Sequence, residues 1–334
     1  MKLQLSALDQ SVGVVGRAQD SIIRQTVELA QHCESLGYKR FWVSEHHSHP
    51  GIIGTAPEIL MAAIAMKTTQ IRIGSAGVML PHYAALKVAE QFRVLDALAP
   101  GRIDLGLGRA PGSDRRTAQL LNPNQFPSDQ FPQQILELKT WLSGAPFPAG
   151  HPAHGVFAYP QSETVPQIWV LGSSDYGAQL AAHFGLPYAF AHFITDGQGL
   201  DQAMGLYQEG FKPSSTLAKP HATLCVWAMV AATREEAMRQ FSSRARFKMD
   251  RNRGVISPLM SPQAALDSFK PEESLALEQL QQKAIVGDAK EVGDQLRALA
   301  ERFDLDEIVV ITWAHDPQAQ KDSYALLAQE LSLG

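Results

Sequence analysis

The sequence predicts a single (β/α)8 TIM barrel formed by the whole chain, residues 1–334. Eight short apolar segments recur along it, and most of them alternate with segments whose apolar residues recur at helical spacing. Residues 71–112 show the repeating unit, because strand, crossover helix and strand follow one another within about forty residues. An open dinucleotide-binding sheet is less favoured, since residues 8–11 (LDQS) stand where its glycine fingerprint is expected.

The first half of the chain contains the more regular predicted elements. Ile22, Val27 and Ala30 share one face of the first helix, and Gly37 is expected to end that helix in a left-handed conformation. Residues 99–101 (APG) end the third helix in the same half. The expected strands are residues 3–8, 41–43, 71–80 and 103–107, and the expected helices are residues 21–36, 57–66 and 83–98.

The second half is less regular because many prolines interrupt residues 122–166. Its expected strands are residues 167–171, 187–191, 223–231 and 307–312, and its expected helices are residues 131–142, 288–303 and one that Gly185 ends. Residues 251–286 are long for a loop, so we expect an insertion or lid between strands seven and eight.

Composition excludes several classes of partner. Hydrophobic residues make up 45% of the chain and charged residues 19%, which is typical of a globular protein. A net charge of −5 gives no general attraction to nucleic acid or to an anionic membrane. Without a signal peptide or a transmembrane run, and with Cys33 and Cys225 at no metal or redox spacing, a cytoplasmic protein is expected.

One basic run departs from this balance. It contains Arg244, Arg246, Lys248, Arg251 and Arg253. We expect it to form a solvated helix face, and we favour this over a docking or phosphate-contacting surface.

The candidate chemistry lies where predicted strands end, because ligands of parallel sheets bind at the carboxyl ends of the strands. Residues 45–49 (EHHSH) follow the second strand. Neighbours on an extended segment point to opposite sides, so His46 and His47 cannot easily face one metal ion, whereas His47 and His49 can. His192 and His315 after later strands keep a metal site open. A general acid–base or ligand-positioning role is favoured, ahead of purely structural polar residues and of metal ligands.

Two features predict an anion site at the same end of the barrel. Arg109 follows the fourth strand beside Gly108, and a guanidinium suits bidentate phosphate binding. Gly172, Ser173 and Ser174 precede a helix whose free N–H groups and dipole attract an anion, although such residues are more often plain helix caps. Together they suggest a phosphorylated ligand, and nearby apolar side chains can hold its flat ring system. These side chains are Val78, Met79, Phe190 and Trp313.

Several motifs, in order and spacing, resemble the bacterial luciferase-like flavin monooxygenases. The resemblance covers nearly the whole chain and is poorest in the proline-rich stretch and after Lys212. Residues 109–114 (RAPGSD) are most similar to a bacterial subgroup of single-chain proteins. The matching segments are residues 41–47 (FWVSEHH), 74–81 (GSAGVMLP), 89–92 (AEQF), 100–109 (PGRIDLGLGR), 184–187 (FGLP) and 285–288 (IVGD).

The resemblance implies an enzyme that binds reduced FMN and oxidises a small organic substrate with O2. By motif position, His46 is the candidate catalytic histidine, with His47 beside it. Ala76 and Gly77 fall where the family has a cis peptide beside the flavin ring. Arg109, Gly172, Ser173 and Ser174 fall at the phosphate-binding positions. A separate NAD(P)H:flavin reductase and a homodimer formed by helices flanking strands two and three are also implied.

Two departures separate this chain from bacterial luciferase itself. Gly108 stands where that enzyme has a cysteine, and Ser173 stands where it has an acidic residue, so light emission is not implied. Two alternatives remain open. One is a deazaflavin (F420)-dependent oxidoreductase, and the other is a flavin-binding protein without turnover.

Overall fold

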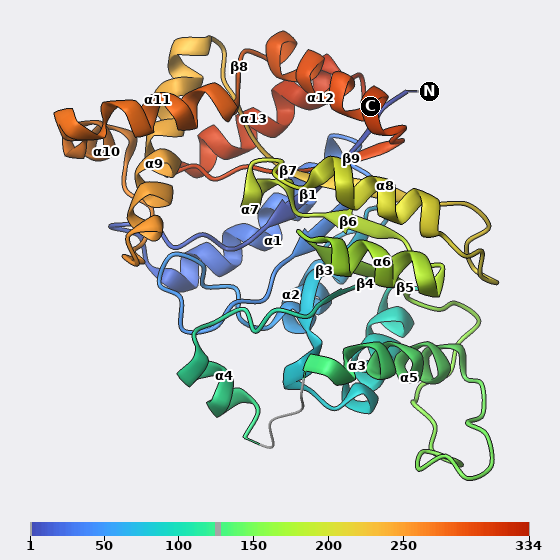
Figure 1. Cartoon of the computed structure of the whole chain (residues 1–334). Helices are drawn as coiled ribbons and strands as arrows, with labels where there is room; N and C mark the ends of the chain where they lie inside the picture. The colour runs from blue at the N-terminus through green and yellow to red at the C-terminus, as the bar shows by residue number, and fades with distance from the viewer. Residues whose placement is uncertain (1, 124–127, 334) are drawn as a thin grey trace.

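The computed structural model describes residues 2–123 and 128–333 and confirms the (β/α)8 barrel (Figure 1). All strand pairs are parallel, and the ring runs β1-β2-β3-β4-β5-β6-β7-β9, with β9 returning to β1. Its strands are β1 (Gln4–Asp9), β2 (Arg40–Val43), β3 (Arg72–Met79), β4 (Ile103–Gly108), β5 (Gln167–Gly172), β6 (Tyr188–Phe190), β7 (Ala222–Val230) and β9 (Glu307–Ile311).

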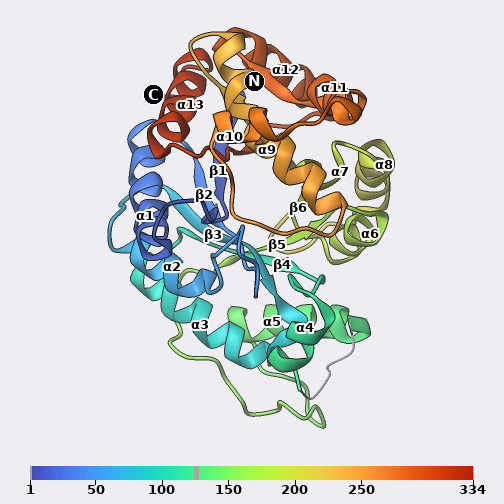
Figure 2. The same cartoon turned by 90° about the vertical axis from the view of Figure 1, so that its left-hand side faces the viewer.

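Helices surround this ring (Figure 2). They include α1 (Gln19–Ser35), α2 (Pro57–Ala65), α3 (Ala85–Leu98), α5 (Phe131–Ser143), α6 (Asp175–Phe184), α8 (Leu200–Gly210), α12 (Ala289–Phe303) and α13 (Pro317–Glu330). Shorter or inserted elements are η1 (Leu80–His82), α4 (Arg115–Leu121), η2 (Ser128–Gln130), α7 (His192–Thr195), α9 (Arg234–Asn252), α10 (Pro262–Ser268), η3 (Pro271–Glu273) and α11 (Ser274–Lys283). As predicted, Gly37 and Gly185 take positive φ angles just after α1 and α6.

The predicted insertion between the seventh and eighth strands of the ring is confirmed. It contains α10, η3, α11 and a short strand, β8 (Ile285–Gly287), that the sequence did not predict. β7 is long enough to pair with three strands in succession: its start pairs with β6, its middle with β9 and its last three residues with β8. β8 therefore lies outside the closed ring and fastens the insertion to it.

The basic run is not a solvated helix face, and that prediction was wrong. Only 7% of Arg244 and 5% of Arg246 is exposed, because α9 packs against β7, β8, α10 and α11. Arg246 is paired with Glu273 and Asp250, and only the later Arg251 and Arg253 are exposed. Charge in the sequence predicted a surface, whereas the partner Glu273 lies too far along the chain to be recognised.

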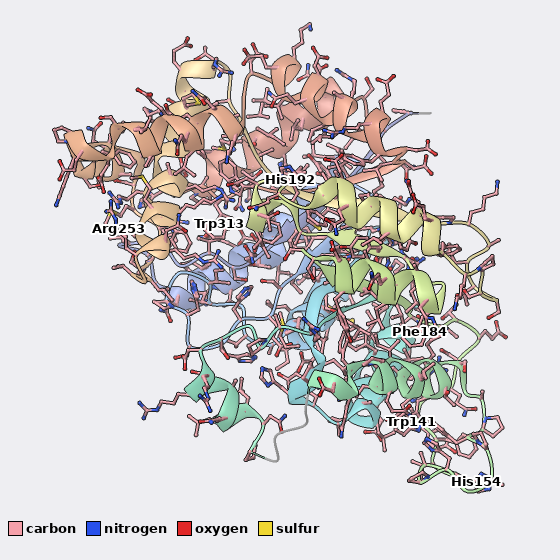
Figure 3. All side chains as sticks on the ribbon, in the orientation of Figure 1. Trp141, His154, Phe184, His192, Arg253 and Trp313 are labelled. Carbon is pink, nitrogen blue, oxygen red and sulfur yellow. The ribbon has the colours of Figure 1, made fainter. Side chains whose placement is uncertain are left out.

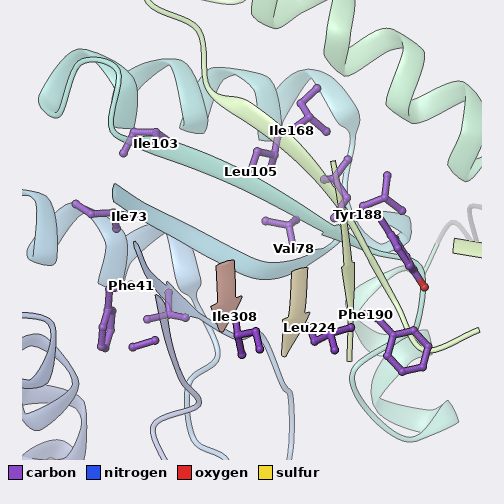
Figure 4. Close-up of a cluster of buried hydrophobic side chains, with 14 of the residues drawn as sticks. Phe41, Ile73, Val78, Ile103, Leu105, Ile168, Tyr188, Phe190, Leu224 and Ile308 are labelled. Atoms are coloured by element: carbon purple, nitrogen blue, oxygen red, sulfur yellow. The ribbon is translucent and has the colours of Figure 1, made fainter. Parts of the chain in front are cut away.

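Apolar side chains fill the space between the strands and the helices (Figure 4). A second buried cluster contains Trp42, Trp169, Trp227 and Trp313, which come from strands of the ring or follow them directly. Both free cysteines are buried. Nowhere in residues 2–123 and 128–333 does a helix combine the length and hydropathy that crossing a membrane requires.

A buried charge network closes the amino-terminal end of the barrel. Arg40 at the start of β2 contacts Asp104 at 2.8 Å and Glu307 at 2.9 Å, where β4 and β9 begin. Burial raises the pKa of Glu307, but Arg40 and Lys39 outweigh it and hold the pKa below its usual value. Paired charges thus occupy this end, and a ligand is expected at the carboxyl end, where parallel barrels bind ligands.

Candidate functional site

The histidine segment and the predicted anion site lie at the same end of the barrel. His46 follows β2, Arg109 follows β4 directly and Gly172 is the last residue of β5. The two loops nearest the mouth also touch, because the backbone N–H of His47 donates to the carbonyl oxygen of Gly112 at 3.1 Å. The structure thus brings together the residues that were predicted separately from three strand ends.

His46 is held by its backbone and by one side chain. Its N–H donates to the carbonyl oxygen of Gly54 at 3.0 Å, and its ring Nδ1 lies 3.3 Å from Ser44 Oγ. Burial, and then the positive charges of His49, Arg251 and His47, lower the pKa of the His46 ring to about 4. The imidazole is therefore neutral near pH 7, and Nε2 is the ring nitrogen left to meet a ligand.

Glu45, next to this histidine, organises the mouth in a way the sequence did not predict. Its buried carboxylate accepts a hydrogen bond from the N–H of Met79 at 2.8 Å and from Tyr83 Oη at 2.6 Å. The same carboxylate oxygen that Tyr83 contacts lies 2.6 Å from His47 Nε2. Glu45 therefore joins the loop after β2 to the end of β3 and fixes the orientation of His47.

The peptide bond between Ala76 and Gly77 is cis, at the position where the family resemblance implies it. It lies within β3, where the register against β4 shifts between Ser75 and Val78. A Cβ atom on Gly77 would lie 2.6 Å from Leu171 Cδ1 and 2.8 Å from the carbonyl oxygen of Gly106. Only glycine therefore fits at this point of the barrel wall.

Arg109 reaches the helix that follows β5. Its guanidinium carbon lies 4.0 Å from the centre of the Tyr176 ring, in the first turn of α6. Arg109 is exposed, and no carboxylate within the described residues pairs with it. The cation thus stands beside the α6 N-terminus, as the two separate predictions required.

The N-terminus of α6 is open to a ligand. Ser174 takes the N-cap position that the sequence predicted, but its side chain makes no capping hydrogen bond, and both Ser173 and Ser174 are at least partly exposed. Asp175 in the first turn of α6 accepts a hydrogen bond from Gln202 Nε2 at 2.6 Å. Free N–H groups, two hydroxyls and a guanidinium together fit a phosphate group.

The metal alternative finds no support in the structure. Across residues 2–123 and 128–333, no three His, Cys, Asp or Glu side chains are arranged to hold an ion. His47 is engaged by Glu45 instead, and the His46 and His49 rings lie 6.1 Å apart between centroids. The acid–base interpretation of this segment stays a prediction.

Sequence comparison identifies the family. Residues 2–305 match the family described as luciferase-like monooxygenase. A protein named luciferase-like monooxygenase from Escherichia coli (strain K12) is 39% identical over 328 residues, which cover 97% of this chain and 96% of that protein. The N-acetyl-S-alkylcysteine monooxygenase of Bacillus subtilis (strain 168) is 35% identical over 331 residues, 98% of this chain and 97% of its own length.

Solved structures agree with the fold. The crystal structure of apo-MsnO8 superposes with a TM-score of 0.91 at 35% identity, covering 99% of each chain. The oxygenating constituent of 3,6-diketocamphane monooxygenase from Pseudomonas putida, solved in complex with FMN, shares the fold with a TM-score of 0.71 at 18% identity. That match covers 99% of this chain and 98% of the other.

Proposed function

The chain belongs to the luciferase-like monooxygenase family, and its named relatives and structural neighbours include flavin-dependent monooxygenases. From that membership we propose that it is an FMN-dependent, two-component monooxygenase. Its substrates are O2 and a small organic molecule. The observation that carries the proposal is the Arg109 guanidinium beside the N-terminus of α6, at the barrel end that also holds His46. No carboxylate in the described part of the chain pairs with this guanidinium, and the Ser174 side chain does not cap the helix.

The cofactor is held at one side of the barrel mouth. Arg109, Gly172, Ser173 and Ser174 bind the phosphate of FMN, and the segment at Gly77 lies against its ring system. Reduced FMN, when bound, supplies the two electrons with which one oxygen atom enters the substrate and the other leaves as water.

His46 and His47 have different roles in the proposed site. His46 is neutral at physiological pH, so its Nε2 can accept or return a proton at the reacting centre. His47 lies next to His46 in the chain, and its hydrogen bond to Glu45 fixes the orientation of the His47 ring. Tyr83, which lies between η1 and α3, donates a hydrogen bond to the same carboxylate of Glu45.

Reduced FMN comes from a partner. We infer that a separate NAD(P)H:flavin reductase delivers it, because the glycine-containing turn after β4 is followed by Pro111 rather than by a nucleotide-binding helix. We also propose a homodimer formed through α2 and α3. Four large apolar side chains on or next to these helices are 47–69% exposed, namely Ile59, Met66, Val94 and Leu98.

Anaerobic titration of the purified protein with flavins tests the proposal. We expect reduced FMN to bind more tightly than oxidised FMN, and both to bind more tightly than reduced F420. Preferential binding of F420 would establish the deazaflavin alternative instead. Absence of measurable binding by reduced and oxidised FMN would reject the proposed function.

A further inference from the structure

Arg244, in the middle of α9, is a buried cation that forms no ion pair with any residue the structure describes. Its side chain stands between two tryptophan rings, 4.6 Å from the centre of Trp227 and 5.2 Å from that of Trp313. Within the described residues its one hydrogen bond runs from Nη2 to the carbonyl oxygen of Phe193 at 3.1 Å. No described carboxylate lies within ion-pair distance of it.

The other buried arginines of the described chain show how unusual this is. Arg40 is paired with Asp104 and Glu307, and Arg246 with Glu273 and Asp250. Arg93 donates to four backbone carbonyl oxygens. A buried charge is costly unless it is paired or fully hydrogen-bonded, so Arg244 lacks an acceptor that its counterparts have.

Arg244 remains charged in spite of this environment. Burial lowers the pKa of its guanidinium to about 9, and the carboxylate of Asp196 opposes that effect. Asp196 itself is engaged by Lys248, so it does not neutralise Arg244. The two flanking indoles also lack acceptors, because Trp227 Nε1 and Trp313 Nε1 are buried donors with no hydrogen-bond partner among the described residues.

This group lies at the carboxyl end of the ring, because Trp313 comes two residues after the end of β9 and Phe193 is in α7, directly after β6. The helix α9 that carries Arg244 lies at the same end (Figure 2). Trp313 lies between the strands and α9 (Figure 3). An aromatic path connects it to the histidines: the ring centroids of Trp313 and Phe247 are 4.9 Å apart, those of Phe247 and His49 6.2 Å, and those of His49 and His46 6.1 Å. Arg244 is thus linked to the candidate catalytic histidine through packed side chains.

The position of Arg244 around the ring separates it from the phosphate site. Arg109 follows β4, whereas Trp313 follows β9, and four steps around the ring separate these two strands in either direction. Arg244 also contacts Trp227 on β7 and the carbonyl oxygen of Phe193 after β6, so it lies on the β6-β7-β9 side of the mouth, whereas Arg109 lies at β4. Arg244 also lines a cleft of about 20 Å³, which is room for a water molecule or two, together with Phe193, Asp196, Trp227, Lys248 and Lys283.

We propose that Arg244, framed by Trp227 and Trp313, binds the carboxylate of the organic substrate and so selects small organic acids. The inference rests on the proposed function, because it assigns the substrate side of the same mouth. A planar guanidinium held by Phe193 presents paired N–H donors that match the two oxygens of a carboxylate. The cleft must widen when the acid enters.

Flavin-free protein tests this without any turnover. Butanoate and benzoate are titrated against butanamide and benzamide, with tryptophan emission and the thermal midpoint as readouts. In the wild type we expect the acids to shift both readouts and the amides to shift neither. Arg244→Met should lose about ten- to a hundredfold in acid affinity, the range expected for hydrogen bonds to a charged group.

The variants keep the test decisive. Methionine fills the same space without a charge, and replacing an unpaired buried ion by an apolar chain preserves folding. Arg244→Lys keeps the charge but not the fork and should bind acids with intermediate affinity. The matched control is Arg239→Gln, on the exposed face of the same helix, which should bind acids as the wild type does.

Two results would overturn the inference. One is equal binding of acids and amides by the wild type, and the other is unchanged acid binding by Arg244→Met. A variant that loses FMN affinity but keeps acid affinity would likewise overturn it and assign Arg244 to the cofactor. Since acid binding is measured without flavin, a protein that binds acids through Arg244 but no FMN would reject the proposed function alone.

Discussion

The guanidinium of Arg109 lies over the ring of Tyr176, so the end of β4 and the first turn of α6 meet at one point. Stacking orients the cation beside the two serines that precede the helix. The N–H groups of Arg109 stay available to a ligand, because no described carboxylate pairs with this guanidinium. The first prediction follows from this contact.

Arg109→Gln should weaken the binding of reduced FMN about ten- to a hundredfold, because a charge-assisted contact to the phosphate is lost. Riboflavin, which has no phosphate, should bind the variant and the wild type equally. Isothermal titration under nitrogen measures both ligands. Arg116→Gln, an exposed substitution on α4, is the control. Equal FMN affinity in Arg109→Gln and wild type would contradict the assignment.

His46→Ala should retain FMN binding and lose coupling between O2 consumption and product formation, because the neutral base at the reacting centre is missing. Oxygen-electrode traces compared with hydrogen peroxide release measure the coupling. His183→Ala, on the exposed end of α6, serves as control. A variant that couples normally would favour a different proton acceptor.

The low pKa of His46 also predicts a pH dependence of stability. Its folded value of about 4 lies below the ordinary 6.5, so the unfolded chain binds more protons between these values. The contribution is fully present above pH 6.5 and is lost progressively as the pH falls toward 4. Thermal midpoints measured across this window should fall less steeply in His46→Gln than in the wild type. Parallel curves for the two proteins would refute the assignment.

Tyr83→Phe should lower the free energy of unfolding by about 1.5–3 kcal/mol, because Glu45 loses a hydrogen bond in a buried site. The carboxylate also fixes His47, so kcat should fall more than KM rises. Urea denaturation and steady-state kinetics separate these effects. Tyr159→Phe, at an exposed ring, should change neither quantity. Loss of stability with unchanged kcat would leave Tyr83 a purely structural role.

Glu307→Gln should destabilise the fold by about 3–5 kcal/mol, because it leaves Arg40 only partly compensated at the closed end of the barrel. The pKa of Glu307 is held low, so its stabilising effect is present above about pH 4.5 and is lost as the pH falls further. Calorimetry at pH 7 and pH 4 measures the change. FMN affinity of the folded variant should be unchanged, since the network lies at the opposite end from Arg109.

The sequence predicted the ring because strands of a closed parallel barrel are buried on both faces and read as apolar runs. It also predicted the strand-end positions of His46 and Arg109. β8 was missed because three residues within an insertion are too few to show a period. The role of Glu45 was missed because its partner Tyr83 lies on another element.

The burial of Arg244 could not be predicted from the sequence either. A run of basic residues reads as surface, and only the packed structure reveals that Trp227 and Trp313 enclose one of them. The sequence shows five tryptophans, but nothing in it predicts that Trp227 and Trp313 pack against α9. Contacts between distant segments decide such cases.

The extension of β7 beyond the ring has an evolutionary consequence. The last three residues of β7 pair with β8, which directly follows residues 253–283. That segment is therefore anchored to the barrel at both of its ends. That stretch can change in length or composition while every pairing of the ring persists. Evolution can thus change the substrate preference of this fold by altering residues 253–283, while the proposed cofactor site in the barrel stays unchanged.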